Sequence, residues 1–323
     1  MNRAVQVVTT TGPEGVALRD VPEPVPAAGE VVIDVHAIGV SFPDLLLSRG
    51  QYQLRPAVPF TLGADCAGTV ATAADGFVVG QRVAAFLPHG AAAERVAIPG
   101  SWVFPLPDVL TFAQGAALPL NYLTAHFALA VRGQVRPGET VLVHGGAGGV
   151  GTACLQVARA LGARAIAVVS TEEKRRAAIT VGADHAVLVS EFREAVAEIT
   201  GGAGVDIVVD VVGGDVVTDS LRSLAPLGRL LVVGFAAGQG IPEIKVNRLL
   251  LGNIDVRGVG WGAYALPRPG YLREQWAELL PMIESGFVVP LVGATYPMGE
   301  FSRALVDMDS RRTLGKSVVL VRD

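Results

Sequence analysis

The chain has 323 residues, of which 50% are apolar and 17% are charged, and its net charge is −4. This composition is typical of one large or two ordinary globular domains and excludes an intrinsically disordered chain. Because basic residues form no long run, we expect no surface for nucleic acid or an anionic membrane. The two cysteines, Cys66 and Cys154, are too few for a disulfide framework and are expected to be buried thiols.

The first hundred residues predict short strands rather than helices. Val31–His36 is strand-like, and apolar stretches recur near Thr69–Ala71, Arg82–Phe86 and Arg95–Ile98, separated by Gly, Pro or Asp. This close spacing favours a partly closed antiparallel barrel over β-α-β units. The start of the chain does not fit a secretory signal, and apolar runs fall far short of the ~20 residues of a membrane span. We therefore expect a soluble, cytoplasmic protein.

From about Thr111 the pattern changes to helices and apolar strands in alternation. Continuous apolar strands interleaved with amphipathic helices predict a parallel, doubly wound sheet, which makes the chain an α/β protein. The predicted strands are Thr140–His144, Ala165–Val169, Ala186–Leu188, Ile207–Val211 and Arg229–Val233. The predicted helices are Phe112–Ala117, Tyr122–Val131, Val150–Leu161, Glu172–Val181 and Val216–Leu224.

Past about Ile254 the alternation fades, although a helix at Tyr271–Ser285 and a strand at Ser317–Val321 are still predicted. We expect this tail to complete the first domain. The result is a discontinuous catalytic domain of residues 1–120 and 256–323, with a dinucleotide-binding domain of residues 121–255 inserted in it.

The segment Gly146–Gly151 matches the G-x-G-x-x-G fingerprint of dinucleotide sites. A lone match is weak in a glycine-rich chain, but this one lies between a predicted buried strand and a predicted amphipathic helix. The first glycine permits the tight turn, the second lets backbone approach a pyrophosphate, and the third allows the helix to pack closely. Free N–H groups at the helix N-terminus would bind the phosphates. The predicted cofactor contacts are Gly146, Gly148, Gly149, Val150 and Gly151.

The end of the second predicted strand indicates which dinucleotide binds. NAD sites usually carry Asp or Glu there for the ribose 2′-hydroxyl, whereas this chain has Ser170-Thr171 followed by Lys174. A hydroxyl and a cation suit a 2′-phosphate, which a carboxylate would repel. Glu172 and Glu173 are close by and are expected to open the next helix, where acidic residues are favoured. Ser170, Thr171 and Lys174 therefore predict NADPH, with a solvated helix position as the alternative for Lys174.

In these motifs the chain resembles the medium-chain dehydrogenase/reductase superfamily, and specifically its zinc-independent quinone oxidoreductase branch. The sequence differs from this branch at Gly145-Gly146, where members commonly have a pair of small residues, Ser and Ala. It extends over almost the whole chain and implies a GroES-like barrel domain, an inserted Rossmann domain and a homodimer. The residues that carry the resemblance are Gly138-Glu139-x-x-Leu142, Gly148–Gly151, Gln156, Arg159, Gly39–Asp44, Pro59–Gly63, Ala67–Val70, Asn121–Ala125 and Gly315–Leu320.

The positions that hold zinc in alcohol-dehydrogenase relatives carry other residues in this chain. By the resemblance, Ser41 stands at the early cysteine and Gly63-Ala64-Asp65 at the Gly-His-Glu. Zinc prefers Cys and His ligands in a tetrahedral array, which these positions do not offer. The cysteine-rich lobe of a structural zinc is missing too, because Pro88–Pro99 contains no cysteine. We therefore expect no zinc, and we expect His36 and His144 to be structural.

Without a metal, the reduction of a simple ketone is difficult, but the reduction of an activated acceptor is feasible. A quinone or an α,β-unsaturated carbonyl takes hydride at a conjugated carbon, and the charge spreads to an oxygen. Such chemistry needs an oriented nicotinamide, a hydrogen-bond donor and an apolar pocket. The sequence thus predicts a zinc-independent reductase that transfers hydride from NADPH to a quinone or another activated α,β-unsaturated carbonyl.

The resemblance implies several residues on the acceptor side. Tyr52 aligns with a tyrosine that relatives place near the nicotinamide, where its phenol would donate a hydrogen bond; a packing role is the alternative. Ser41 and Asp44 match positions that contact the nicotinamide ribose or the substrate, although Ser41 replaces the usual Asn. Asn121 would line the substrate side or cap the following helix.

The resemblance also implies cofactor contacts outside the fingerprint. Thr124 resembles a cofactor-contacting threonine, and the Gly234-Phe235 loop runs beside the nicotinamide half in relatives. Arg311 and Lys316 match a basic region that approaches the adenine-side phosphates, with a solvated role as the alternative for each. Trp261 is either a pocket wall or a core residue.

Two other functions stay open. A 2-enoyl thioester reductase acting on a CoA or carrier-bound substrate would use the same hydride chemistry and a basic groove, for which Arg49 and Arg55 are candidates. A non-catalytic NADPH-binding protein with a structural or redox-sensing role would bind the cofactor tightly and never oxidise it.

Overall fold

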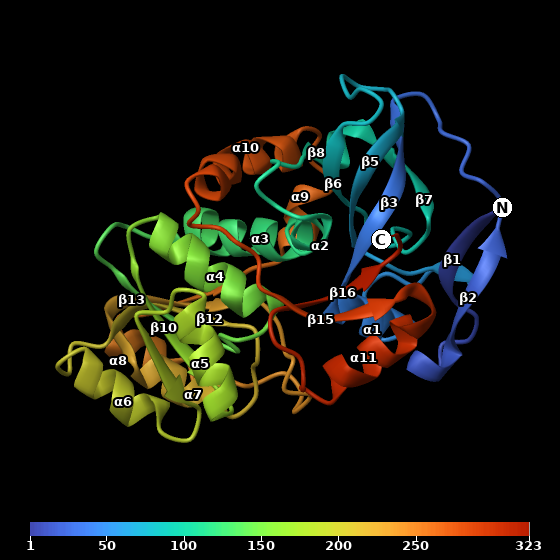
Figure 1. Ribbon diagram of the computed structural model, residues 1–323. Helices are drawn as coiled ribbons and strands as arrows, with labels where there is room; N and C mark the ends of the chain where they lie inside the picture. Colours follow the sequence, from blue (N-terminus) through green and yellow to red (C-terminus); the bar gives the residue numbers. More distant parts are fainter. Residues whose placement is uncertain (323) are drawn as a thin grey trace. The chain divides into compact units, whose positions relative to one another are not determined.

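The computed structural model describes residues 1–322 (Figure 1). They divide into two compact units, each with its own sheet structure. The first unit comprises residues 1–120, 269–277 and the chain from Pro290 onward, and the second comprises residues 121–268 and 278–289. The domain boundaries expected from the sequence, at 120/121 and 255/256, stay a prediction. Within the described residues, every helix is too short or too polar to span a bilayer.

A six-stranded parallel sheet organises the second unit, in the order β11-β10-β9-β12-β13-β14. Counted within the sheet, this order is 3-2-1-4-5-6, which is typical of dinucleotide-binding folds. The predicted parallel sheet is confirmed, and all five predicted strands belong to it. The strands are β9 (Thr140–His144), β10 (Arg164–Val169), β11 (His185–Leu188), β12 (Val205–Asp210), β13 (Leu224–Val232) and β14 (Asp255–Gly258).

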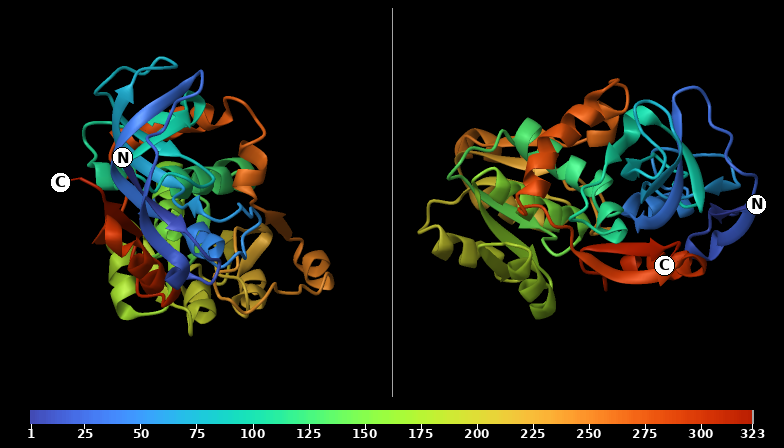
Figure 2. Two further views of the ribbon diagram at one scale, coloured as in Figure 1. Left: turned by 90° about the vertical axis from the view of Figure 1, so that its right-hand side faces the viewer. Right: turned by 45° about the horizontal axis from the view of Figure 1, so that its top comes forward.

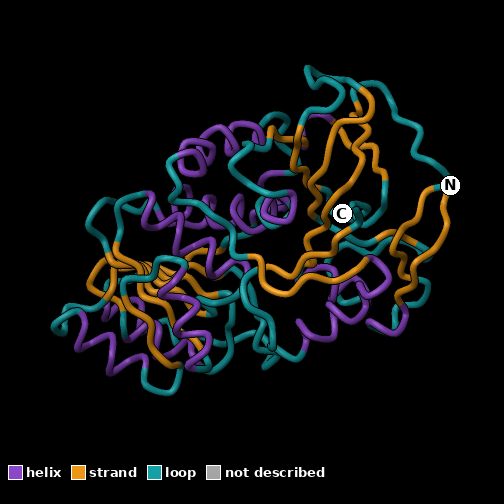
Figure 3. The backbone as a smooth tube through the Cα atoms, in the orientation of Figure 1, coloured by secondary structure: helices purple, strands orange, loops and turns teal. Residues whose placement is uncertain are grey.

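Helices connect and cover these strands, as the purple segments around the orange sheet in Figure 3 show. All five residues of β9 are buried, because a doubly wound sheet is covered on both faces. Side chains of several strands, among them Leu142 and Leu230, form a core with Phe192 and Val196. The helices are α4 (Gly149–Ala160), α5 (Glu172–Thr180), α6 (Phe192–Ile199), α7 (Val216–Arg222), α8 (Asn247–Gly252) and α9 (Trp261–Ala265).

Two longer helical segments include residues of both units. α3 (Pro119–His126) continues into a π-helical stretch at Phe127–Gly133, and α10 spans Tyr271–Glu284. Both were predicted from the sequence as helices with somewhat different ends. After the π-helical stretch, Arg229 on β13 donates to both oxygens of Glu139 at 2.9 and 2.6 Å and to the Gly133 carbonyl. This buried ion pair fixes the turn that leads into β9.

Antiparallel pairing predominates in the first unit, as the sequence predicts. One sheet has the order β15-β16-β3-β5-β6-β8 with β7 also paired to β3, and a second has the order β2-β1-β4. The red strand β16 lies beside the blue strand β3 (Figures 1 and 2). The strands are β1 (Asn2–Val7), β2 (Val16–Val21), β3 (Glu30–Val40), β4 (Phe60–Thr61), β5 (Asp65–Thr72), β6 (Arg82–Phe86), β7 (Arg95–Pro99), β8 (Val103–Pro105), β15 (Val292–Pro297) and β16 (Lys316–Leu320).

Short helices complete the first unit. They are α1 (Phe42–Ser48), α2 (Phe112–Gly115) and α11 (Phe301–Asp309). The register of β3 against β5 shifts after Val32 and again after Val35, and such irregularities bend a strand. The bend lets β3 pair with β5, β7 and β16 around one apolar core.

Candidate functional site

The glycine-rich turn joins β9 to α4, which confirms the strand–turn–helix context that the fingerprint requires. It begins at Gly145, whose φ of +65° suits glycine. The Gly148 N–H donates to the Gly145 carbonyl at 2.9 Å, and the Gly146 N–H donates to the Val168 carbonyl of β10 at 3.1 Å. The first intrahelical bond runs from the Thr152 N–H to the Gly148 carbonyl, so the N–H groups before Thr152 stand at the helix N-terminus.

The three fingerprint glycines differ in what requires them. A Cβ at Gly151 would lie 2.0 Å from the Gly145 carbonyl oxygen, and one at Gly146 would lie 2.7 Å from the Ala167 Cβ. A Cβ at Gly148 would meet only the Gly145 carbonyl oxygen, at 3.4 Å, and its φ of −87° is open to any residue. The chain's own packing thus explains the first and third glycines. It leaves Gly148 as the position where a missing side chain makes room for a ligand.

The residues expected to read the 2′-phosphate lie together after β10. Lys174 Nζ donates to Ser170 Oγ at 3.4 Å, and both residues are at or near the surface. Thr171 is the N-cap of α5, and its hydroxyl accepts from the Lys174 N–H at 3.3 Å. Glu172 and Glu173 open α5 as expected, and Glu172 accepts from the Arg175 guanidinium at 3.2 Å. The hydroxyl of Ser170 and the ammonium of Lys174 therefore lie side by side at the surface, where a ligand can reach them. The Thr171 hydroxyl instead caps the N-terminus of α5.

The loops after β12 and β13 are joined to each other. Asp210 Oδ1 accepts from the N–H groups of Val212 and Gly213 at 2.8 and 2.9 Å. The Ala236 N–H donates to the Val211 carbonyl at 3.1 Å, so the predicted Gly234-Phe235 loop is held beside this turn. The glycine turn, the Ser170 pair and these two loops all follow carboxyl ends of strands in one parallel sheet. Ligands of doubly wound sheets bind at that edge.

Two further candidates lie on α3 in the second unit. Thr124 is buried. Asn121 is the third residue of α3 and is buried to 5% exposure, with its amide against the glycine turn. Because the helix begins at Pro119, the alternative in which Asn121 caps it is wrong.

His144 is a structural residue, as expected. Its Nε2 donates to Ser220 Oγ at 2.8 Å, because Ser220 Oγ itself donates to the Val216 carbonyl at 2.7 Å. The ring packs edge-on against Phe192, with 4.9 Å between centroids. Burial lowers the pKa of His144 to about 4, since a charged imidazolium there would lose its hydration.

The low pKa of His144 makes stability fall as the pH falls. Between its ordinary value near 6.5 and the folded value of about 4, the unfolded chain binds a proton that the folded chain refuses. From about pH 7.5 to about pH 5, the free energy of unfolding should drop by ~2 kcal/mol through this residue. Asp44 acts in the opposite direction, because burial raises its pKa to about 6.

The contribution of His144 to the pH dependence of stability is therefore measured by comparing the wild type with a variant that lacks the imidazole. Urea unfolding at the two pH values should show a loss in the wild type that exceeds the loss in His144→Gln by ~2 kcal/mol. Gln keeps an N–H donor for Ser220 but does not titrate. Equal pH dependence in the two proteins would show that His144 is not buried in its neutral form.

The acceptor-side candidates lie in the first unit. Tyr52 follows α1, is half-buried and packs against the apolar core of that unit. Burial raises the pKa of Tyr52, so its phenol is protonated at neutral pH and can donate a hydrogen bond. Asp44 is fully buried, and its two oxygens accept from the Ser41 N–H at 2.8 Å and the Gly63 N–H at 2.9 Å. The backbone thus uses both oxygens of Asp44, which fixes the start of α1.

A buried lysine joins Ser41 to Asp65. Lys316 Nζ donates to Ser41 Oγ at 2.7 Å and to Asp65 Oδ2 at 2.5 Å. Ser41 Oγ also donates to Asp65 Oδ2 at 3.2 Å, and Asp65 Oδ1 accepts from the Leu120 N–H at 2.8 Å. Gly39 makes room for the lysine, because a Cβ there would lie 2.6 Å from Lys316 Cε. The expectation that Lys316 approaches adenine-side phosphates is wrong: its ammonium is buried in this cluster.

The Ser41–Asp65–Lys316 cluster does not fit a zinc ion. An ammonium already pairs with the one carboxylate, and a serine hydroxyl is a poor zinc ligand. No group of three or more His, Cys, Asp or Glu side chains in residues 1–322 could hold a metal ion. Both cysteines are buried and unpaired, as expected. Arg311 is exposed and follows α11 with a φ of +57°.

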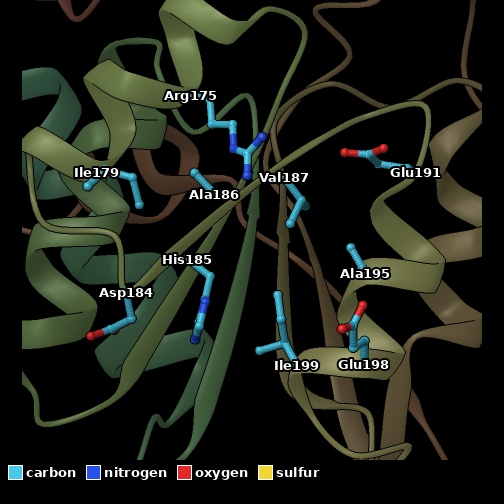
Figure 4. A pocket seen from close by; sticks show the side chains of 10 residues that line it. All are labelled: Arg175, Ile179, Asp184, His185, Ala186, Val187, Glu191, Ala195, Glu198 and Ile199. Atoms are coloured by element: carbon cyan, nitrogen blue, oxygen red, sulfur yellow. The ribbon is translucent and has the colours of Figure 1, made fainter.

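A separate shallow pocket lies on the second unit, between α5, β11 and α6 (Figure 4). Arg175 and Glu191 lie toward one end, and Asp184, His185 and Glu198 lie toward the other. None of the predicted site residues lines this pocket, so it is distinct from the candidate cofactor site.

Comparisons with known proteins cover almost the whole chain. Residues 27–108 match the family model of the alcohol dehydrogenase GroES-like domain, and residues 149–285 match that of a zinc-binding dehydrogenase. Quinone oxidoreductase-like protein 2 of Mus musculus is 36% identical over 91% of this chain and 85% of its own length. These matches confirm the predicted fold class, in which an α/β chain combines a GroES-like domain with a Rossmann-type domain.

Solved structures are similar over their full length. A probable oxidoreductase from Mycobacterium abscessus is 43% identical, with a TM-score of 0.90 and 99% of each chain covered. The quinone oxidoreductase from Thermus thermophilus, also solved in complex with NADPH, is 38% identical, with a TM-score of 0.86 and coverage of 99% of this chain and 100% of that one.

Proposed function

Because this chain belongs to the quinone oxidoreductase branch of the medium-chain dehydrogenase/reductase superfamily, we propose that it reduces a quinone or another activated α,β-unsaturated carbonyl with NADPH, and that it needs no zinc. Membership of this branch makes the chain an NADPH-dependent oxidoreductase. The observation that supports zinc independence is the Lys316 ammonium between Ser41 and Asp65. A cation already pairs with the carboxylate that a zinc ion would need.

The residues of the second unit fit NADPH, which supplies the hydride when bound. Gly148 leaves room for a phosphate beside the N-terminus of α4, where free N–H groups and the helix dipole favour an anion. Ser170 and Lys174 offer a hydroxyl and an ammonium for the 2′-phosphate. Further cofactor contacts are proposed from the sequence motifs and the likeness to the family. They are Thr124, Val150, Phe235 and Arg311.

In the first unit, we assign Tyr52 the role of hydrogen-bond donor to the acceptor oxygen. Negative charge develops on that oxygen as hydride reaches the conjugated carbon, and a neutral phenol stabilises it there. The raised pKa of Tyr52 keeps the phenol protonated over the whole neutral range. Ser41 and Asp44 hold this part of the chain in place through backbone and lysine contacts, and their direct contact with nicotinamide or substrate is a proposal.

The test is an acceptor panel with enzyme that has been treated with a chelator. NADPH oxidation is followed with quinones, enones and enoyl-CoA thioesters, and Tyr52→Phe is measured alongside. We expect turnover with quinones and enones without added metal, and a kcat lower by about tenfold or more in Tyr52→Phe. An unchanged kcat in Tyr52→Phe would exclude the donor role. Activity that appears only when zinc is restored would contradict zinc independence.

The thioester alternative has less support. A thioester reductase would need a basic groove for the CoA phosphates, and Arg49 and Arg55 were the candidates for it. The Arg49 guanidinium, however, already pairs with both carboxylate oxygens of Asp309, at 3.1 and 2.6 Å. Of the two, Arg55 alone then remains for the phosphates of CoA. A faster reaction with enoyl-CoA than with every quinone in the panel would nevertheless favour this function.

We also propose a homodimer formed through the β14 edge of the second unit's sheet. The segment between β13 and β14 exposes several large apolar side chains, which a partner would cover. They are Ile241, Val246, Leu250 and Leu251, each 74–78% exposed. Sedimentation of the wild type should give twice the chain mass, and Leu250→Asp with Leu251→Asp should give monomers. A monomeric wild type at micromolar concentration would contradict the dimer.

A further inference from the structure

Asn121 is a buried residue whose side-chain amide makes no hydrogen bond to another described residue. The residue is 5% exposed, and its amide atoms are not among the fully buried side-chain atoms of residues 1–322 that lack a partner, so the amide keeps access to open space. A side chain that is buried except at its amide, and that uses the amide for no bond within the protein, holds this donor in a fixed place and open to a ligand. Its neighbours on α3 pack in the ordinary way: Tyr122 donates to Gln156 Oε1 at 2.7 Å, and Thr124 is buried.

The unpartnered amide lies against the first residue of α4. A Cβ built on Gly149 would be 2.5 Å from Asn121 Nδ2 and 3.4 Å from its Oδ1. Gly149 is helical and its φ is not positive, so the backbone does not require glycine there. The amide of Asn121 is what leaves no room for a side chain at position 149.

This contact places a donor beside a helix N-terminus that has further free donors. α4 has 12 residues, and its first intrahelical bond is made by the Thr152 N–H, which leaves the N–H groups of Gly149, Val150 and Gly151 at its end. At Gly148, directly before them, a Cβ would meet only the Gly145 carbonyl oxygen, at 3.4 Å. An amide that is held at this end and bonds to no protein atom is suited to an anionic oxygen.

We propose that Asn121 Nδ2 donates a hydrogen bond to the pyrophosphate of the bound dinucleotide, and that Gly149 is glycine because the amide occupies this space. The inference rests on the proposed NADPH binding. It assigns Asn121 to the cofactor rather than to the acceptor, on whose side the sequence placed it.

The test compares two ligands that share only the adenosine 2′-phosphate end. NADPH carries the pyrophosphate, and adenosine 2′-monophosphate lacks it. Asn121→Ala should weaken NADPH binding by about tenfold, the effect of one hydrogen bond to a charged group. Asn121→Asp should weaken it by about a hundredfold, because a carboxylate repels the phosphates. Both variants should bind adenosine 2′-monophosphate within about twofold of the wild type, since its contacts are elsewhere.

A double-mutant cycle with Gly149→Ala checks the geometry in proteins that keep the turn. Alone, the added methyl group should displace the amide and weaken NADPH binding by about as much as Asn121→Ala does. In the Asn121→Ala background it should add little. NADPH affinity that is unchanged in Asn121→Ala, or an equal loss for both ligands, would overturn the inference. A wild type that does not bind NADPH would overturn the proposed function itself.

Discussion

Gly151→Ala is expected to destabilise the fold, whereas Gly148→Ala should keep the fold and lose the cofactor. A Cβ added at Gly151 would lie 2.0 Å from the Gly145 carbonyl oxygen, and both partners belong to the turn's own backbone, so neither can move without opening the turn. We expect a loss of ~3 kcal/mol in the free energy of unfolding, at the upper end for overpacking. The Gly148 position has a φ that alanine adopts freely, so its cost should stay within about 1 kcal/mol.

For NADPH binding we expect the opposite order, with the larger direct loss of affinity in Gly148→Ala. The methyl group at position 148 points into the space left for the phosphate, and it should weaken NADPH by about a hundredfold, which corresponds to ~3 kcal/mol. Urea unfolding measures the first effect, and a fluorescence titration of NADPH with protein that is still folded measures the second. If Gly148→Ala binds NADPH as tightly as the wild type, the phosphate does not pass this glycine.

Ser170→Asp is expected to reverse the cofactor preference. A carboxylate at the end of β10 repels a 2′-phosphate and accepts from the ribose hydroxyls of NADH. In terms of kcat/KM, NADPH should lose about a hundredfold and NADH should gain or stay level, a change of ~3 kcal/mol in discrimination. The change is sharp because Ser170 Oγ is 3.4 Å from Lys174 Nζ, so the new carboxylate also neutralises the ammonium.

Lys174→Met is the matched control for this switch. It removes the ammonium and keeps the apolar stem, so NADPH should weaken by about tenfold while NADH is unaffected. Steady-state kinetics with both cofactors measures each ratio. A wild type that prefers NADH by about tenfold would show that the Ser170 pair does not read a 2′-phosphate.

Much of the second unit could be predicted from the sequence because its signals are local. β9 is a continuous apolar run between a Pro-Gly turn and the glycine-rich turn, and its bounds were predicted without error. α6 was not predicted, because its N-cap Glu191 makes no side-chain bond and it buries only Phe192 and Val196. β14 and α8 were also missed, since they are short and mostly exposed.

The first unit was harder, because its elements depend on distant partners. β3 was predicted to end at His36 but runs to Val40, where it pairs with β16. α1 was not predicted, although Ser41 and Asp44 stand at the spacing of a helix cap. These residues were interpreted only as site residues, and the structure gives them a local structural role as well.

The site was predictable only in its local parts. The fingerprint and the Ser170 pair are read from neighbouring residues, but Lys316 meets Asp65 across 251 positions of sequence. The one signal for that ion pair was a lysine at the start of an apolar strand. The contact between Asn121 and Gly149 likewise depends on the packing of α3 against the turn, which no residue pattern predicts.

The most direct test mixes chelator-treated protein with NADPH and a quinone and follows both reactants in one experiment. We predict that NADPH oxidation and quinol formation proceed together, one for one, without added zinc and much faster than with NADH. Protein that binds NADPH but leaves it reduced with every quinone and enone would contradict the proposed reductase activity and would favour a non-catalytic role.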